Sequence, residues 1–115
     1  MKKPIIGITL DSEKKKTYSK FPWYALRENY LTSLTKFNAI PFPLLHEKKY
    51  IDDFCHLIDG LIITGGDFDI HPKLYKTSNT QSKNIKNKRT NFELDIFNKF
   101  FKYNKPILGI CGGAQ

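Results

Sequence analysis

The stretch PILGICGGAQ, residues 106–115, joins a short apolar run to a cysteine surrounded by small residues. Within it, GICGG at 109–113 fits the pattern G-x-[SC]-x-G of a nucleophile elbow, a sharp turn from a buried strand into a helix. The residues two before and two after the nucleophile must be small, because the backbone turns tightly there. The stretch therefore predicts an α/β sheet with a thiol, Cys111, at the carboxyl end of one strand.

An elbow places its nucleophile at the start of a helix, where the positive end of the helix dipole favours a thiolate. The N–H of Gly112 is then in position to stabilise an oxyanion that forms beside the sulfur. The alternative interpretation is that Cys111 is a small buried residue closing a strand, since free cysteine is often buried and inert. A five-residue pattern does not by itself decide between the two.

Apolar runs elsewhere in the chain alternate with amphipathic segments. Runs rich in β-branched residues predict strands at 4–10, 39–45 and 60–64, besides the one that begins at Pro106. The two prolines of the second run indicate an edge strand. Apolar residues at helical spacing predict helices over 23–38, 50–58 and 90–104. Strands that alternate with helices predict a parallel sheet with flanking helices.

Two of these helices carry more specific signals. The first is defined by apolar positions from Trp23 to Phe37 and is expected to end near Asn38. The last is expected to begin at Thr90, because TNFE at 90–93 fits a capping box. Its apolar stripe consists of Phe92, Ile96, Phe97, Phe100 and Phe101. Residues 76–88, rich in Lys, Asn, Ser and Thr, are predicted to form a solvated loop.

A pair of glycines, Gly65 and Gly66, follows the strand at 60–64. They are therefore expected at the carboxyl end of a strand, the side on which open α/β sheets bind ligands. Two glycines let the backbone approach a substrate and present a second N–H to an oxyanion. The alternative is a simple tight turn capped by Asp67 or Asp69.

Composition limits the class of protein. A chain of 115 residues has room for one domain, and its 40% hydrophobic and 26% charged residues are ordinary for a globular protein. No apolar run is long enough to span a membrane, and the N-terminal run lacks the features of a signal peptide. Two cysteines, Cys55 and Cys111, give no disulfide framework and fit a reducing compartment. The expected location is the cytoplasm, without membrane binding.

The formal net charge of +8 raises the question of nucleic-acid binding. Of the 19 basic residues all but Arg27 and Arg89 are lysine, whereas nucleic-acid binders usually use more arginine. We interpret the charge as a solvated surface and expect no specific nucleic-acid partner. The alternative is nonspecific binding through the basic segment 73–89.

Three motifs, taken together and in this order, resemble the class I glutamine amidotransferase-like superfamily, specifically its γ-glutamyl-γ-aminobutyrate hydrolase type, peptidase family C26. The segment at 58–75 is similar to that family's strand and G-G-x-D-x-x-P-x-x-Y loop, and the segment at 89–97 to its R-D-x-x-E helix. The segment at 105–115 resembles its P-[IV]-L-G-I-C-R-G-x-Q elbow. The resemblance implies a truncated flavodoxin-like fold in which residues 1–115 are the N-terminal half of the domain.

The resemblance also implies a chemistry. Cys111 would attack a γ-glutamyl amide, with the N–H groups of Gly66 and Gly112 as oxyanion donors, and water would hydrolyse the resulting thioester. Gly65 and Gln115 would bind the substrate. No metal or other cofactor is implied.

The sequence departs from the family pattern in several places. The family's catalytic histidine and acidic residue lie downstream of the elbow, and His46, His56 and His71 do not match them. His46 and His56 are expected at the surface or its boundary, and His71 lies in the Gly-Gly loop at a position that the family does not use as a base. Gly112 and Thr90 stand where the family commonly has Arg and Asp. We therefore expect this chain to be inactive, or nearly so, on its own.

Two alternatives remain open at this point. The chain could be a non-catalytic half that binds a second polypeptide, which would supply the histidine, the acid and the missing strands. An unpaired edge of the last strand would favour such docking. A different thiol hydrolase, of the dienelactone-hydrolase kind, also uses a G-x-C-x-G elbow. The glycine pair with Asp67, one strand before the elbow, favours the amidotransferase-like interpretation instead.

Overall fold

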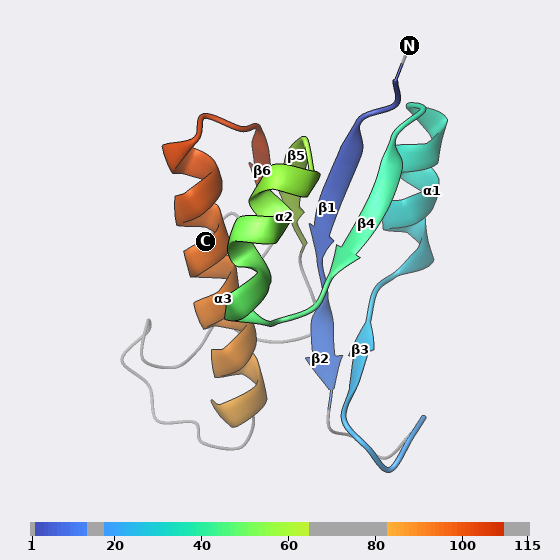
Figure 1. The fold of residues 1–115 in the computed structure, drawn as a ribbon. Coiled ribbons are helices and arrows are strands. Elements are labelled where there is room, and N and C mark those ends of the chain that lie inside the picture. The colour runs from blue at the N-terminus through green and yellow to red at the C-terminus, as the bar shows by residue number, and fades with distance from the viewer. Residues whose placement is uncertain (1, 14–17, 65–82, 110–115) are drawn as a thin grey trace.

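A computed structural model of the chain describes residues 2–13, 18–64 and 83–109. Four parallel strands form its sheet, in the order β4-β1-β5-β6 (Figure 1). Their bounds are Ile5–Thr9 for β1, Ile40–Leu44 for β4, Gly60–Ile63 for β5 and Ile107–Gly109 for β6. The predicted fold class and strands are confirmed, as is the edge position of the strand with two prolines, β4.

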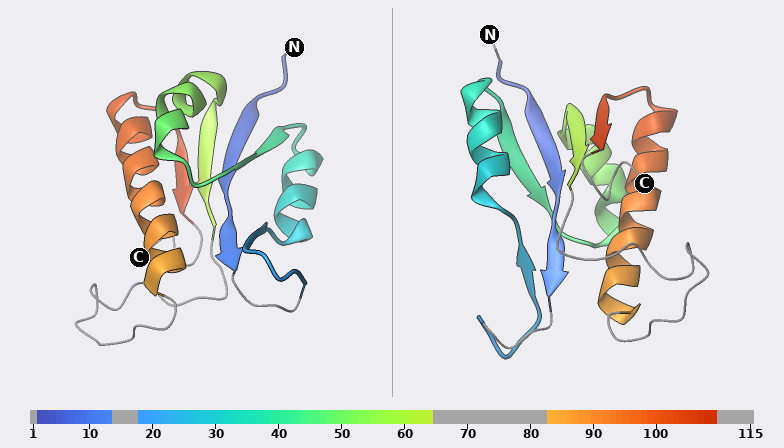
Figure 2. Two further views of the ribbon diagram at one scale, coloured as in Figure 1. Left: turned by 60° about the horizontal axis from the view of Figure 1, so that its bottom comes forward. Right: turned by 180° about the vertical axis from the view of Figure 1, so that it is seen from behind.

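Helices cover both faces of the sheet (Figures 1 and 2). Helix α1, Glu28–Lys36, lies on one face beside β4, and helices α2, Ile51–Leu57, and α3, Lys83–Lys102, lie together on the other. A short 3₁₀ turn, η1 at Lys48–Tyr50, leads into α2. The helix that follows β1, α1, thus lies on one face and the helix that follows β5, α3, on the other, and the strands after them, β4 and β6, lie on opposite sides, so the carboxyl ends of β1 and β5 form a topological switch point. Open α/β sheets bind their ligands at such points.

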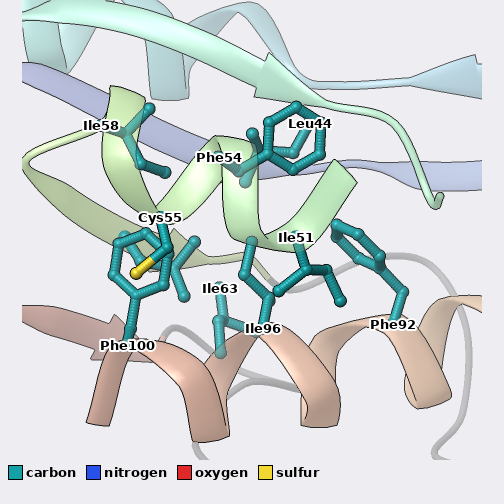
Figure 3. Close-up of a cluster of buried hydrophobic side chains, with 10 residues drawn as sticks. Leu44, Ile51, Phe54, Cys55, Ile58, Ile63, Phe92, Ile96 and Phe100 are labelled. Atoms are coloured by element: carbon teal, nitrogen blue, oxygen red, sulfur yellow. The ribbon is translucent and has the colours of Figure 1, made fainter. Parts of the chain in front are cut away.

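The hydrophobic core lies between the sheet and the helices α2 and α3 (Figure 3). The buried face of the predicted helix over 50–58 is confirmed, because its apolar residues pack against those of α3. These core residues are Ile51, Phe54, Cys55, Ile58, Phe92, Ile96 and Phe100. The predicted stripe on α3 is only partly correct, since Phe97 and Phe101 face solvent and stack on each other with ring centroids 6.1 Å apart.

The start of the first helix was predicted incorrectly. Residues Trp23–Ala25 form strand β3, which pairs antiparallel with β2, Asp11–Glu13, and α1 begins only at Glu28. The aromatic side chains at 23 and 24 suit a strand, and the Tyr24 hydroxyl accepts the backbone N–H of His46 at 3.0 Å. Pairing with β2 therefore prevails over the helical spacing of the apolar residues. Helix α1 buries none of its side chains.

The last helix begins earlier than the capping box predicted. Helix α3 starts at Lys83, so Thr90 lies within it, and the end of the predicted loop at 76–88 is helical. Lysine is a good helix former, and Arg89 reaches the sheet from inside the helix. The helix ends were predicted correctly. Asn38 and Asn104, with φ of 61° and 57°, terminate α1 and α3 in the left-handed conformation that asparagine tolerates.

One glycine of the sheet is required by packing. Gly7 is buried in β1, and a Cβ atom there would overlap the Ile58 side chain and lie 3.0 Å from Leu44 Cδ1. Its absence lets the segment that follows α2 approach the centre of the sheet. No helix within the described residues is both long enough and apolar enough to span a bilayer.

Candidate functional site at the carboxyl edge of the sheet

Strands β5 and β6 bring the two predicted site segments to the same edge of the sheet. The strands are parallel neighbours, and Ile63 is paired with Gly109. Gly65 comes two residues after Ile63, and Cys111 comes two residues after Gly109. Adjacent strands lie about 4.8 Å apart. The predicted residues Gly65, Gly66, Cys111, Gly112 and Gln115, together with His71, lie outside the described residues.

Two threonines join the carboxyl ends of β1 and β5 just before the first of these segments. The backbone N–H of Thr64 donates to Thr9 Oγ1 at 3.0 Å, and the Thr64 hydroxyl donates to the Thr9 carbonyl at 2.9 Å. Both side chains are fully or almost fully buried. This pairing continues the contact between β1 and β5 beyond their last ladder hydrogen bonds, at the switch point of the sheet.

Arg89 of α3 reaches into the same place. Its Nη2 donates to the Thr64 carbonyl at 2.7 Å and to Thr64 Oγ1 at 3.1 Å. Its Nε donates to Glu93 Oε2, and its Nη1 forms an ion pair with Asp11 Oδ1, both at 3.2 Å. The Arg89 side chain is completely buried. One guanidinium thus joins the end of β5, the start of β2 and one turn of α3.

Both burial and ion pairing affect the protonation of the carboxylates in this cluster. Burial raises the pKa of the Glu93 carboxyl above its ordinary value, although the Arg89 guanidinium and the Thr9 hydroxyl act in the opposite direction. A raised pKa lets Glu93 take a proton more readily, which relieves the excess negative charge that two carboxylates place beside one cation. Among the described residues, no three His, Cys, Asp or Glu side chains are grouped as a metal site.

The place of Arg89 in this cluster was not predicted from the sequence, in which Arg89 was considered only as part of a helix motif and of a basic segment. Its residue type could have indicated a buried position. The chain uses lysine for almost every cation, and an arginine at the head of an apolar stripe fits a buried position, because its planar fork can satisfy several acceptors at once. Its burial also removes Arg89 from any nucleic-acid surface, contrary to the alternative that included it there.

His46 lies in the interior, contrary to the prediction of a surface or boundary position. Its side chain follows β4, is 2% exposed, and packs against the rings of Tyr24 and Phe92. Its Nε2 lies 2.9 Å from the Leu10 carbonyl and must donate to it. Because β4 and β6 are at opposite edges of the four strands, His46 does not lie beside the end of β6.

His56 is exposed, as predicted, and lies in α2 shortly before β5 begins, at the amino end of the sheet. Its Nδ1 is 2.7 Å from the Asp52 carbonyl of the same helix. His56 thus lies at the opposite end of the sheet from the strand ends that lead to Cys111 and the glycine pair. His46 lies at the same end as they do, but it follows β4, which β1 separates from β5 and which is three strands from β6. Cys55 is buried in the core, 3% exposed, away from that edge.

Comparison with known proteins gives a consistent result. The sequence profile of the peptidase C26 family matches residues 4–115. A glutamine amidotransferase-like protein of Rickettsia prowazekii is 44% identical over 117 aligned positions, which cover 98% of this chain and 42% of the relative. Two glutamine amidotransferase-like proteins of Lactococcus lactis are each 36% identical over 66 positions, or 56% of this chain and 35% and 28% of theirs.

The chain spans less than half the length of the curated relatives that it matches. The profile, by contrast, matches it almost from end to end and includes both the glycine pair and the cysteine of the elbow. A match over this share of the chain, with the parallel sheet and flanking helices described above, excludes the dienelactone-hydrolase alternative. The chain belongs to the peptidase C26 family.

Proposed function

We propose that this chain carries the nucleophile and the oxyanion donors of a thiol hydrolase that acts on γ-glutamyl amides. Cys111 is the nucleophile, the N–H groups of Gly66 and Gly112 stabilise the oxyanion, and Gly65 and Gln115 bind the substrate. The observation that carries this proposal is the family match over both segments, supported by the parallel pairing of β5 with β6, whose ends lead into them.

In this reaction the Cys111 thiolate attacks the γ-carbonyl carbon and forms a tetrahedral oxyanion. The oxyanion collapses, the carbon–nitrogen bond breaks, and the amine leaves with a proton from a general acid. Water then attacks the thioester, releases glutamate and restores the thiol. A histidine must move these protons and an acidic residue must orient it. By resemblance to the family, both of these residues lie on the carboxyl-terminal side of the elbow.

The experiment measures glutamate release from a γ-glutamyl amide by the chain alone and by the chain combined with a polypeptide that covers the rest of the Rickettsia prowazekii relative. We expect release only in the combination, and we expect Cys111→Ala to abolish it. The matched control is Cys55→Ala, which removes the buried thiol and should retain the activity. Release that survives Cys111→Ala, or a stable combination that releases no glutamate, would contradict the proposal.

A second candidate function is that of a non-catalytic half that binds another polypeptide. A specific observation favours it, because β6 pairs only with β5 among the described strands and Leu108 of β6 is 56% exposed, while α3, which contacts β6, exposes the rings of Phe97 and Phe101. An exposed strand edge flanked by apolar side chains is suited to pairing with a further strand. This docking would occur whether or not the assembled protein is active.

Binding is tested by measuring the mass of the complex that the chain forms with the same polypeptide. We expect Leu108→Asp or Phe101→Asp to prevent a one-to-one complex, because each places a charge on the docking surface. Phe37→Asp is the matched control, since Phe37 is 82% exposed at the end of α1, near the opposite edge of the sheet. Complex formation that tolerates Leu108→Asp and Phe101→Asp would refute this docking surface.

A further inference from the structure

The contacts of Arg89 exceed what is needed to attach α3 to the sheet. The apolar residues Phe92, Ile96 and Phe100 of that helix are already buried in the core. Burying a guanidinium costs solvation free energy unless several hydrogen-bond partners compensate for it. An apolar side chain of similar volume would often pack equally well. The groups to which Arg89 donates hydrogen bonds should therefore explain why a buried arginine is present here.

What Arg89 holds is the carbonyl of Thr64. This is the shortest of its contacts, 2.7 Å, and a hydrogen bond from a charged donor is stronger than one between neutral groups. A peptide unit is planar, so fixing the Thr64 carbonyl also fixes the plane through which the chain continues. The same nitrogen donates to Thr64 Oγ1, which itself donates to the Thr9 carbonyl. Thr64 is thus held through both its backbone and its side chain.

We propose that Arg89 is a positioning residue that fixes the carboxyl end of β5, after which Gly66, one of the two proposed oxyanion donors, follows in the sequence. This inference rests on the proposed function, because Gly65 and Gly66 matter for catalysis only if Cys111 attacks a carbonyl group. Asp11 and Glu93 hold the guanidinium itself in place. Arg89 acts through Thr64 and is not a catalytic residue.

The test compares hydrogen exchange of the Thr64 amide, followed by NMR, in the unchanged chain and in Arg89→Met. Lys105→Met is the matched control, because Lys105 is likewise a cation that donates to backbone carbonyls, those of Cys55 and Ile58, but it is only partly buried and lies at the amino end of the sheet. Exchange of the central β1 amides reports the overall loss of stability in each variant. Arg89→Lys is the second variant, since an ammonium keeps the charge but cannot reach Thr64, Asp11 and Glu93 together.

We expect Arg89→Met to accelerate exchange at Thr64 by about tenfold or more beyond its effect on β1, because a charge-assisted hydrogen bond to this residue is lost. Arg89→Lys should show the same local effect to a smaller extent, which keeps the test decisive if Arg89→Met does not fold. Lys105→Met should change the two regions equally. Equal acceleration of β1 and of the Thr64 amide in both Arg89 variants would overturn the inference and leave Arg89 as a helix attachment.

This outcome can be separated from failure of the proposed function. The exchange measurement needs neither substrate nor activity, so a local effect of Arg89 with no Cys111-dependent glutamate release would refute the proposed chemistry alone. In the combination of the two polypeptides, Arg89→Lys should lower kcat with little change in KM. The reason is that the oxyanion forms in the transition state and the tetrahedral intermediate, and is absent from the bound substrate. An unchanged kcat in that variant would refute the positioning role alone.

Discussion

His46 is a titratable side chain kept in the protein interior by its neighbours. Its Nε2 donates to the Leu10 carbonyl, which fixes the tautomer and leaves Nδ1 with a lone pair. Burial lowers the pKa of His46 from 6.5 to about 4, and the nearby cations of Arg89 and Lys88 act in the same direction, whereas the Leu10 carbonyl opposes them. His46 is therefore neutral at pH 7 and must gain its proton largely through unfolding.

The stability of the protein is expected to fall between pH 6.5 and 4 because of His46. In that range the unfolded chain binds a proton that the folded chain excludes, so the contribution is complete above about pH 6.5 and is lost as the pH falls toward 4. The full difference is roughly 3 kcal/mol in the free energy of unfolding. Urea unfolding at several pH values should show a shallower acid dependence for His46→Gln than for the unchanged chain.

His56→Gln is the control for this prediction, because it makes the same substitution at an exposed histidine. The raised pKa of Glu93 acts in the opposite sense, reducing stability as the pH rises above the normal range of a glutamate, but it is common to all three proteins. Parallel profiles for His46→Gln and the unchanged chain would show that His46 is not buried in the neutral form.

Gly7 and Gly60 offer a second test at the scale of single residues. A methyl group at Gly7 would overlap the fully buried Ile58 side chain and crowd Leu44, so Gly7→Ala is expected to lower the free energy of unfolding by about 1–3 kcal/mol. At Gly60 the nearest atom would be Ile6 Cδ1 at 3.2 Å, a contact that a small shift relieves. Gly60→Ala should therefore change stability by less than about 1 kcal/mol, since alanine also restricts the unfolded chain.

Urea unfolding of both glycine variants at one pH measures the difference directly. A loss at Gly60 equal to or greater than that at Gly7 would mean that the close approach of Ile58 to β1 is not a constraint on the sequence. The prediction does not depend on backbone conformation, because neither glycine adopts a positive φ.

At the scale of elements, the four strands of the parallel sheet could be predicted because each is a continuous apolar run, as a strand covered on both faces requires. The ends of α1 and α3 were predictable from single asparagines. The starts of these helices were not. Trp23 has helical spacing to later apolar residues, but its backbone pairs with β2, and Thr90 has the sequence of a cap in the middle of a helix. Local sequence patterns do not show with which distant segment a stretch of backbone will pair.

Of the predicted site, the structure describes only the strands that lead to it, β5 and β6. The sequence placed the glycine pair after one predicted strand and the elbow after the next, and the structure shows that these two strands are parallel neighbours, with Ile63 paired with Gly109. The buried cluster around Arg89 was not predictable, because its members come from β1, β2, β5 and α3 and no periodicity connects them. Such clusters depend on distances between segments far apart in sequence, such as the 25 residues between Thr64 and Arg89.

Helix α3 provides a prediction at this scale through two adjacent phenylalanines. Phe100 is completely buried in the core, whereas Phe101 is 70% exposed and stacks only on Phe97. Phe100→Ala is expected to lower the free energy of unfolding by about 3–5 kcal/mol, and Phe101→Ala by less than about 1 kcal/mol. Urea denaturation of both variants gives the comparison, and similar losses would show that α3 is rotated about its axis from the orientation described.

The whole molecule combines a sheet edge bearing the proposed nucleophile with a strongly basic surface, and the two have different causes. The edge follows from topology, since parallel strands must all end on the same side. The net charge of +8 follows from the abundance of lysine, and ion pairs such as Lys48–Asp95 and Lys99–Asp52 involve well-exposed carboxylates. Exposed pairs of this kind contribute little to stability. The surface charge therefore concerns association with other molecules more than the fold.

This charge predicts weak attraction to polyanions without sequence preference. Lysine contacts with phosphates release counterions, so affinity for a duplex should fall steeply with salt, by roughly a thousandfold between 50 and 200 mM if about six phosphates are contacted. Fluorescence anisotropy with two duplexes of equal length and different sequence would measure both properties. Arg89→Met should bind like the unchanged chain, because Arg89 is completely buried, although its removal costs one positive charge. Binding that distinguishes the duplexes, or that persists at about 300 mM salt, would contradict a purely electrostatic attraction and would require base contacts that a lysine-rich surface is poorly suited to make.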